Sequence, residues 1–211
     1  MILFVRNFFY KNRFFIRESN SLDLSKDAIA RMKKTTVKVS GQGNQLVIAK
    51  GAVITNCEIR LSGKNNKIYI GENVRFRSGK IYLKDTENQT ISIGADTTVE
   101  GAYLLVDEAA SIKIGQDCML STDIIIRVGD KHSILDSQTK LRINFAKDVV
   151  LEDRVWLGRA VQVLKGTHLQ PETVVGACSV VTSKFSEGHC VVAGMPARIV
   201  KKNTRWHRDL I

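Results

Sequence analysis

An aliphatic residue recurs at every sixth position in the last third of the chain. The series starts at Leu151 and continues through Leu157, Val163, Leu169, Val175 and Val181. Four residues after each of the first five members stands a small or β-branched residue, namely Val155, Val161, Thr167, Thr173 and Ser179. A period of six does not fit an α-helix of ~3.6 residues per turn. It fits a short strand that ends in a tight corner, so that three strands close a triangular coil and successive coils pair in parallel ~4.8 Å apart.

A looser form of this pattern occupies the first half of the chain. Five segments align, with starts 22, 23, 21 and 37 residues apart: LVIAKGAVI from Leu46, IYIGENVRF from Ile68, ISIGADTTV from Ile91, IKIGQDCML from Ile112 and VVLEDRVWL from Val149. We expect unusual backbone angles at the glycines that directly follow the aliphatic position, which are Gly71, Gly94, Gly115, Gly158 and Gly176. An ordinary β-sandwich is the alternative, but consecutive hexads without a slip disfavour it. The sequence therefore predicts an all-β chain wound as a parallel β-helix.

The open ends of such a ladder need caps. SKDAIARMKK, from Ser25 to Lys34, predicts a short helix with Ser25 as N-cap and Asp27 in its first turn. At the other end, the glycine and proline of AGMPARIV are expected to end the ladder. The predicted organisation is an N-terminal aromatic and basic cap over 1–36, a β-helix domain over 37–202 and a basic tail over 203–211.

The repeat is interrupted once, between residues 127 and 147. This stretch, RVGDKHSILDSQTKLRINFAK, lacks the apolar period and carries a histidine, His132. We interpret it as an excursion loop that leaves the coil. Taken alone, a histidine in such a loop is by default a solvated surface residue.

Lys and Arg exceed Asp and Glu by 11, and the excess lies at the two ends of the chain. Residues 1–34 carry a net charge of +5 and residues 184–211 of +4, whereas the whole middle carries +2. A nucleic-acid-binding protein usually has a basic face across its folded body, so we expect no nucleic-acid partner. The distribution suits phosphates, an acidic polymer or an anionic membrane surface.

The first sixteen residues, MILFVRNFFYKNRFFI, mix aromatic and basic side chains. They have no clean apolar core and no small-residue cleavage site, so a secretory signal is not indicated. Two interpretations stay open for residues 1–17: a cap over the first coil, which we favour, and an interfacial segment on the membrane. The phenylalanines on which both depend are Phe4, Phe8, Phe9, Phe14 and Phe15.

The cysteines and the hydropathy indicate a compartment. Cys57, Cys118, Cys178 and Cys190 form no CxxC pair, so neither a disulfide framework nor a zinc site is expected. A reducing cytoplasm is the simplest compartment. No apolar run approaches the ~20 residues of a membrane-spanning helix.

The repeat and the C-terminal block together resemble the hexapeptide-repeat acyltransferases. LEDRVWLGRAVQVLKGTHLQPETVVGACSVVTSKF, followed by VVAGMPARIVKK, is similar to the ending of that family, and GDKHSIL is similar to the histidine loop of its sugar O-acetyltransferase branch. The RVGDKH loop, the spacing of His132 and Trp156 and the tail KKNTRWHR look most like bacterial capsule O-acetyltransferases acting on sialic-acid polysaccharides. The resemblance implies a left-handed parallel β-helix, an exception to the usual crossover hand, and a homotrimer.

The same resemblance implies an active site in the groove between two subunits, reached by the excursion loop. His132 would then be the general base, a role that a neutral imidazole suits near pH 7. Asp130 would orient its ring, or would only form a turn. Trp156, outward on its hexad, would stack on a sugar ring or on the pantetheine arm, or would pack at the trimer interface. The remaining histidines are expected to be solvated or structural: His168, His189 and His207.

The implied co-substrate is acetyl-CoA. Backbone groups at Gly158, Ala177 and Thr182 would contact its pantetheine arm, and an amide near Gly158 is a candidate oxyanion donor. The resemblance also implies basic contacts from Lys184, Arg198, Lys201 and Lys202. Arg198, Lys201 and Lys202 would face the phosphates. Ordinary solvated cations are the alternative for each lysine.

Cys178 stands where the family often has glycine or serine. No base lies beside it in the sequence, and direct transfer in a ternary complex does not need a nucleophile. We therefore expect neither a covalent intermediate nor a metal.

The leading functional hypothesis is an O-acetyltransferase that acts on an acidic bacterial surface polysaccharide in the cytoplasm. It would lie at the inner face of the cell membrane if residues 1–17 form the interfacial segment. An N-acyltransferase of an amino or nucleotide sugar is the second. A metal hydratase of the same fold needs three converging histidines, which the sequence does not offer. A non-catalytic β-helix scaffold is the last alternative, but it has no need of His132 in an excursion loop.

Overall fold

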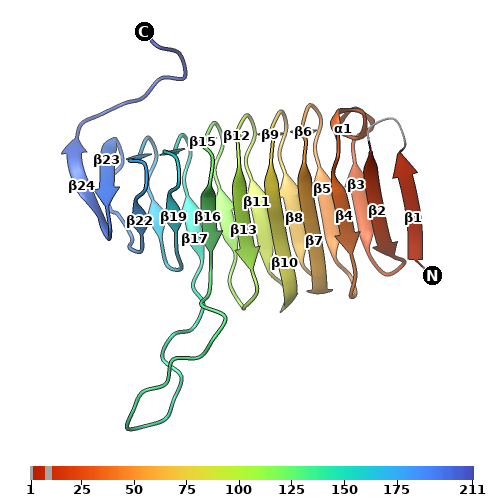
Figure 1. Ribbon diagram of the computed structural model, residues 1–211, viewed down its shortest axis with the longest axis horizontal. Coiled ribbons are helices and arrows are strands. Elements are labelled where there is room, and N and C mark those ends of the chain that lie inside the picture. The colour runs from red at the N-terminus through yellow and green to blue at the C-terminus, as the bar shows by residue number, and fades with distance from the viewer. Residues whose placement is uncertain (1, 8–10) are drawn as a thin grey trace.

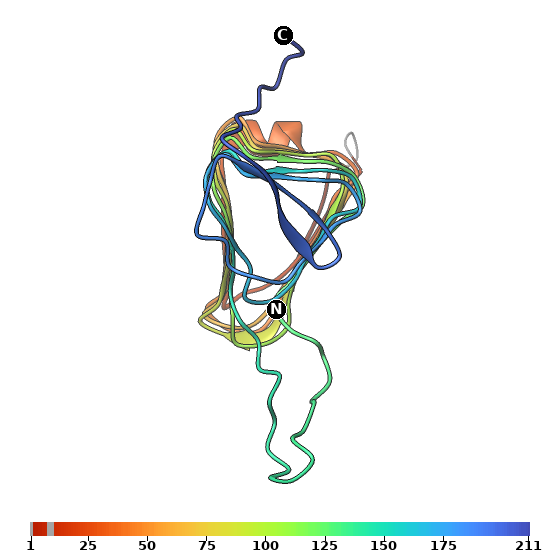
Figure 2. The ribbon, with the colours of Figure 1, turned by 90° about the vertical axis from the view of Figure 1, so that its left-hand side faces the viewer.

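The computed structural model describes residues 2–7 and 11–211. Within these residues the strands form three long sheets, which are the three sides of a prism (Figures 1 and 2). Within a sheet, neighbouring strands come from successive coils and nearly all of them run parallel. The predicted left-handed parallel β-helix of hexapeptide repeats is confirmed.

The strands fall into three sets within the described residues. The nine-stranded sheet contains β1 (Ile2–Asn7), β2 (Asn12–Arg17), β4 (Thr36–Val39), β7 (Cys57–Lys64), β10 (Gly79–Glu87), β13 (Ala102–Val106), β16 (Ile124–Arg127), β19 (Gln162–Val163) and β22 (Val180–Val181). The seven-stranded sheet contains β3 (Ser21–Leu24), β5 (Gln45–Ile48), β8 (Lys67–Ile70), β11 (Thr90–Ile93), β14 (Ile112–Ile114), β17 (Val149–Leu151) and β20 (His168–Leu169). The eight-stranded sheet contains β6 (Val53–Ile54), β9 (Arg75–Phe76), β12 (Thr98–Val99), β15 (Met119–Leu120), β18 (Trp156–Leu157), β21 (Val174–Val175), β23 (Cys190–Gly194) and β24 (Ala197–Lys202).

The strand register reproduces the alignment of the five repeats. Leu46 pairs with Ile68, Ile68 with Ile91, Ile91 with Ile112, and Ile112 with Val149. All five first residues are fully buried and form one column inside the prism. Burial of such aliphatic side chains stabilises the fold by roughly 1.5–3 kcal/mol each.

The hexads of the C-terminal third also behave as predicted. Each aliphatic member from Leu151 to Val181 ends a short strand and is fully buried. The small residues four positions later lie inside the corners, and Val155, Val161, Thr167, Thr173 and Ser179 are all buried. The hydroxyl groups of Thr167, Thr173 and Ser179 find partners there. For example, Thr167 Oγ1 donates to the Val181 carbonyl at 3.0 Å.

The five corner glycines do not have the unusual backbone angles that we expected. None of them has a positive φ; that conformation falls two residues later, at Asn73, Asp96, Asp117, Ala160 and Cys178. Glycine is needed at these positions because the backbones of successive coils approach each other closely there. A Cβ on Gly94 would lie 2.5 Å from the carbonyl carbon of Gly115 in the next coil, a separation far below van der Waals contact. The corners therefore lie where we predicted them, but close packing of the coils, and not a positive φ, is the reason for glycine there.

The N-terminal end is covered by a short helix and an antiparallel strand. Helix α1 (Lys26–Arg31) has the predicted N-cap, because the Ala28 amide donates to Ser25 Oγ at 3.0 Å. β1 pairs antiparallel with β2, whereas β2 and β3 already pair in parallel with β4 and β5. Phe14 and Ile16 of β2 are buried in the core. The parallel ladder therefore begins upstream of residue 37, and Phe8 and Phe9 lie outside the described residues.

The C-terminal end closes with a hairpin. β23 continues the parallel ladder, and β24 turns back antiparallel to it across Met195–Pro196. The glycine and proline of AGMPARIV thus end the ladder as predicted. In the described residues no helix is both long and apolar enough to span a membrane.

Two edges of the prism position the candidate site. We call the edge where the nine-stranded sheet passes to the seven-stranded sheet the loop edge; the segment 128–148 leaves the prism there. We call the edge where the eight-stranded sheet passes to the nine-stranded sheet the glycine edge; Gly158 and Ala177 lie on it.

Candidate active site

The excursion loop projects far from the prism between β16 and β17 (Figures 1 and 2). Its base is closed by the Lys147 amide, which donates to the Val128 carbonyl at 3.0 Å. Its two arms pair farther out, where the Ile143 amide donates to the Ile134 carbonyl at 2.9 Å. The loop is therefore a hydrogen-bonded arm of defined shape.

Asn144 cross-links the arm that carries His132. Its side chain is buried, with Oδ1 accepting from the Ile134 amide at 2.7 Å. Its Nδ2 donates to the His132 carbonyl and to Asp130 Oδ2, both at 2.8 Å. The backbone of His132 is thus held in place while its side chain is exposed. Asn144 could not be identified from the sequence, because nothing in the loop repeats.

Asp130 lies at the base of the loop, and its partners differ from the one we predicted. Its carboxylate accepts hydrogen bonds from Lys165 Nζ and from Asn144. The Lys165 ammonium, followed by the Asn144 amide, holds the pKa of this carboxyl below its usual value. In the described chain these contacts fix Asp130 as an anchor of the loop, and its orientation of the His132 ring stays a prediction.

A second ion pair ties the loop to the preceding coil. The Arg142 guanidinium contacts Glu108 through Nη1 at 2.7 Å and Nη2 at 2.9 Å. The hydrogen bonds from Arg142 lower the pKa of the Glu108 carboxyl. The same guanidinium lies 5.1 Å from the centroid of the Phe145 ring. Both ends of the loop are therefore bound to the prism.

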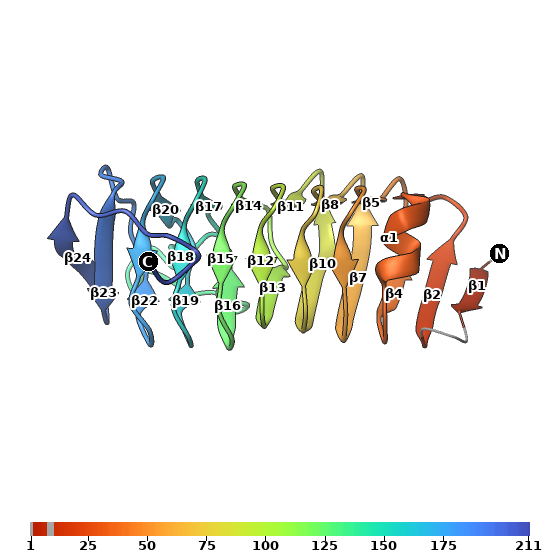
Figure 3. The same ribbon diagram turned by 90° about the horizontal axis from the view of Figure 1, so that it is seen from above.

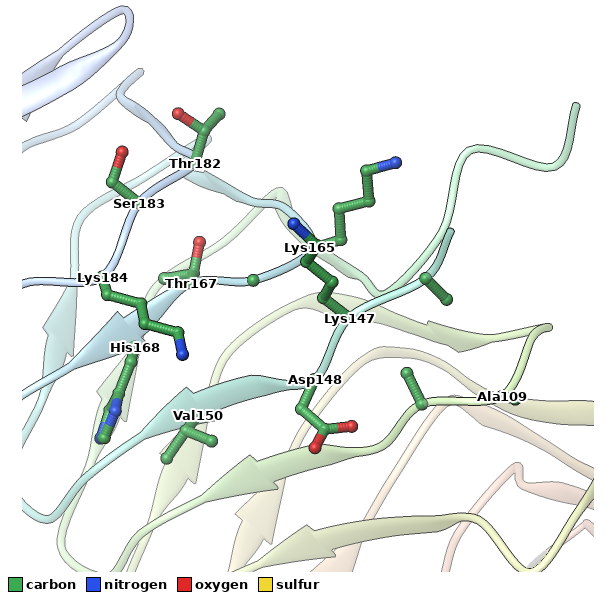
Figure 4. A pocket seen from close by; sticks show the side chains of 13 residues that line it. Ala109, Lys147, Asp148, Val150, Lys165, Thr167, His168, Thr182, Ser183 and Lys184 are labelled. Carbon is green, nitrogen blue, oxygen red and sulfur yellow. The ribbon is translucent and has the colours of Figure 1, made fainter. Parts of the chain in front are cut away.

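A groove of about 850 Å³ runs along the loop edge beside the base of the loop (Figure 4). Three lysines from three successive turns lie around it, namely Lys147, Lys165 and Lys184. Two of the predicted cofactor residues, Thr182 and Lys184, line this groove. Lysines are point charges that bind phosphate or carboxylate groups, so the groove is suited to an anionic ligand.

His168 also lines the groove, and its Nε2 lies 2.8 Å from Glu152 Oε1. His168 begins β20, and Glu152 directly follows the neighbouring strand β17. We predicted a structural or solvated histidine here, and the partner carboxylate is consistent with a structural one. Glu152 and His168 stand in adjacent coils, so only the register could have revealed the pair.

The other predicted site residues lie elsewhere on the single chain. Trp156 is on the eight-stranded sheet, and Gly158 and Ala177 are stacked on the glycine edge. A Cβ on Gly158 would lie 2.8 Å from the Ala177 amide nitrogen, so these two backbones pack directly on each other. One prism therefore places His132 and Trp156 on different parts of its surface.

The basic residues of the C-terminal hairpin are exposed on β24. Lys202 pairs with Glu187 at 2.8 Å, and Arg198 Nη1 donates to the Ala197 carbonyl at 2.9 Å. Lys201 is exposed. Contacts of these residues with coenzyme phosphates stay predictions.

The cysteines are all free. Burial raises the pKa of the Cys57 and Cys118 thiols to about 12, so both stay protonated. Cys178 is exposed. Over residues 2–7 and 11–211, no three His, Cys, Asp and Glu side chains gather as a group able to hold a metal ion.

A polysialic acid O-acetyltransferase from Neisseria meningitidis is 35% identical to this chain over 190 residues, which are 81% of the chain and 88% of the relative. This chain belongs to the hexapeptide-repeat acetyltransferase family. A polysialic acid O-acetyltransferase from Escherichia coli O1:K1 is 37% identical over 123 residues, or 58% of this acetyltransferase. That match spans only 40% of the E. coli protein.

Solved structures agree with this assignment. The polysialic acid O-acetyltransferase OatWY superposes on the acetyltransferase with a TM-score of 0.88, at 34% identity. The match covers 92% of our chain and 90% of OatWY. No protein-family model matches the sequence.

Proposed function

We propose that this acetyltransferase transfers the acetyl group of acetyl-CoA to a hydroxyl of polysialic acid. The observation that carries the proposal is the ordered excursion loop, which fixes the backbone of His132 and whose base lies beside a lysine-lined groove. The full-length similarity to proteins named polysialic acid O-acetyltransferases supports the acceptor class.

The chemistry needs few groups. The His132 imidazole takes the proton of the acceptor hydroxyl as its oxygen attacks the thioester carbonyl. The tetrahedral intermediate collapses, the acetyl ester forms, and the thiol leaves with that proton. Backbone amides near Gly158 and Ala177 are our candidates for holding the oxyanion.

The residues around the groove fit a phosphorylated co-substrate. Lys147 and Lys184 offer cations on the loop edge, and Thr182, which directly follows β22, lines the groove beside them. Arg198 and Lys201 add exposed cations at the end of the ladder. We assign these side chains to acetyl-CoA, with Lys202 partly engaged by Glu187.

A homotrimer would complete the site. The loop exposes five large apolar side chains, each more than half accessible: Ile134, Leu135, Leu141, Ile143 and Phe145. Such a concentration of exposed apolar surface marks an interaction site. Packing of the loop on a second prism would also bring His132 toward residues that the single chain keeps apart from it.

The test is mass spectrometry of sialic-acid oligomers after incubation with acetyl-CoA. The expected product is heavier by one acetyl group, and its ester is released by mild base. His132→Ala should reduce turnover roughly 10²-fold to 10⁴-fold, whereas the exposed His189 serves as a control, and His189→Ala should not. Acetylation of neutral sugars or amines in preference to sialic-acid oligomers would refute the proposal.

A further inference from the structure

The C-terminal tail, residues 203–211, is docked on the prism. Figure 3 shows it running back over the eight-stranded sheet. Arg208 fixes it there by donating to Asp117 Oδ1 at 2.8 Å and to Thr98 Oγ1 at 3.0 Å. The same guanidinium donates to the backbone carbonyls of Asp96 and Cys118. These contacts span two adjacent coils, so the tail has one defined path.

Trp206 is the side chain that this docking buries. Only 7% of it is exposed, and its Nε1 donates to the Arg154 carbonyl at 2.6 Å. Arg154 Nη2 donates in return to the Trp206 carbonyl at 3.1 Å. The Arg154 and Arg208 guanidinium groups lie 4.9 Å and 5.7 Å from the ring centroid. The indole is thus held through both its edge and its faces.

Arg154 is itself rigidly held. Its guanidinium pairs with the Asp117 carboxylate and, at 2.7 Å, with Glu172 Oε1. Glu172 is buried, with 5% of its surface exposed. A buried carboxylate of this kind keeps its charged partner in one place, because separation would leave an unpaired charge away from water.

The rings of Trp206 and Trp156 meet with centroids 6.0 Å apart and planes inclined by 51°. This geometry is that of a favourable aromatic pair. We propose that Trp206 is a positioning residue, and that the docked tail uses it to fix the Trp156 ring for stacking on the acceptor sugar. The inference rests on the proposed function, and of the contacts expected for Trp156 from the resemblance it takes the one with the sugar ring. Leu210 and Ile211 are fully exposed at the end of the tail and take no part in the docking.

The pairing can be measured without any assay of activity. The chain has two tryptophans, so an exciton couplet in the far-ultraviolet circular dichroism reports on this pair. We expect the couplet in the wild-type protein and its loss in both Trp156→Phe and Trp206→Phe. Arg208→Ala should weaken it and should make Trp206 accessible to acrylamide in a Trp156→Phe background. Leu210→Ala is the matched control on the same tail.

Kinetics then separate positioning from simple stability. Trp206→Ala and Arg208→Ala should raise the KM for sialic-acid oligomers roughly threefold to tenfold, with the affinity for coenzyme A and the melting temperature unchanged. Trp206→Phe should restore most of the acceptor affinity. An unaltered couplet and KM in Arg208→Ala would overturn the inference. A normal couplet in a protein that acetylates no sialic-acid oligomer would instead refute the proposed function, and with it the catalytic role of the pair.

Discussion

Asn144 Nδ2 donates a hydrogen bond of 2.8 Å to the backbone carbonyl of His132, from the opposite arm of the excursion loop. The same nitrogen reaches Asp130, and Asp130 in turn accepts from Lys165 on the prism. The position of His132 is therefore set by a chain of contacts that starts in the ladder. A loop of this length without internal bonds would sample many conformations.

Asn144→Ala should lower kcat without unfolding the protein. The substitution removes the cross-link to His132 and leaves the Ile134 amide without its acceptor. A misplacement of about 1 Å in a reacting group can reduce the rate roughly 10²-fold, and we expect a loss of that order. Steady-state kinetics with acetyl-CoA and sialic-acid oligomers check it. Gln138→Ala, at the exposed tip of the loop, is the control, and an equal loss in both variants would refute the role of Asn144.

Leu141→Asp combined with Ile143→Asp should break the association of copies of the chain. Both side chains are more than 60% exposed, and burying the new carboxylates against a partner would be costly. Light scattering after gel filtration should show a smaller species than the wild type. Val200→Asp places one such carboxylate on an exposed apolar residue of β24 and should leave the assembly intact. An unchanged mass in the double variant would rule out the loop as the contact.

Much of the fold could be predicted from the sequence because the hexad period admits few solutions. Once Leu151 and its successors must face inward every six residues, the coil, its corners and the register follow. The physical reason for glycine at the corners could not be predicted in the same way. Both a positive φ and a close approach select glycine, and only the stacked backbones of Gly94 and Gly115 distinguish the two.

The site was predictable only where it belongs to the repeat or interrupts it. His132 was singled out because the period stops around it, and its role as the base is implied by the resemblance and stays a prediction. Asn144 and Lys165 have no period, and they meet Asp130 only because the loop folds back onto its base. The contact between Trp206 and Trp156 could not be predicted for a related reason. Fifty residues separate the two, and the arginines that suggested a basic tail are used to dock the tail on Asp117 and Glu172.

Acid should loosen the excursion loop through Glu108. Arg142 lowers the pKa of this carboxyl in the folded state, so its ion pair stabilises the loop at pH values above the unfolded pKa of about 4.5. That contribution is lost as the pH falls through the lower folded pKa. Hydrogen exchange of the loop amides, corrected for the intrinsic pH dependence of amide exchange, should therefore become less protected on acidification in the wild type. In Glu108→Gln the exchange should be faster at neutral pH and should depend less on acid; a parallel pH dependence in both proteins would contradict this.

Gly94→Ala should destabilise the β-helix because the new methyl group would meet backbone atoms that cannot move aside. Its Cβ would lie 2.5 Å from the Gly115 carbonyl carbon and 2.6 Å from the Gln116 nitrogen. Overpacking of this kind costs about 1–3 kcal/mol, which urea denaturation should reveal as a lower midpoint. Gly101→Ala is the matched control, because its nearest neighbour would be the Thr122 Cα at 3.6 Å. That variant should be neutral or slightly more stable, since alanine restricts the unfolded chain. Equal midpoints for the two variants would show that the coils can separate at Gly94, and that close approach is not what selects glycine there.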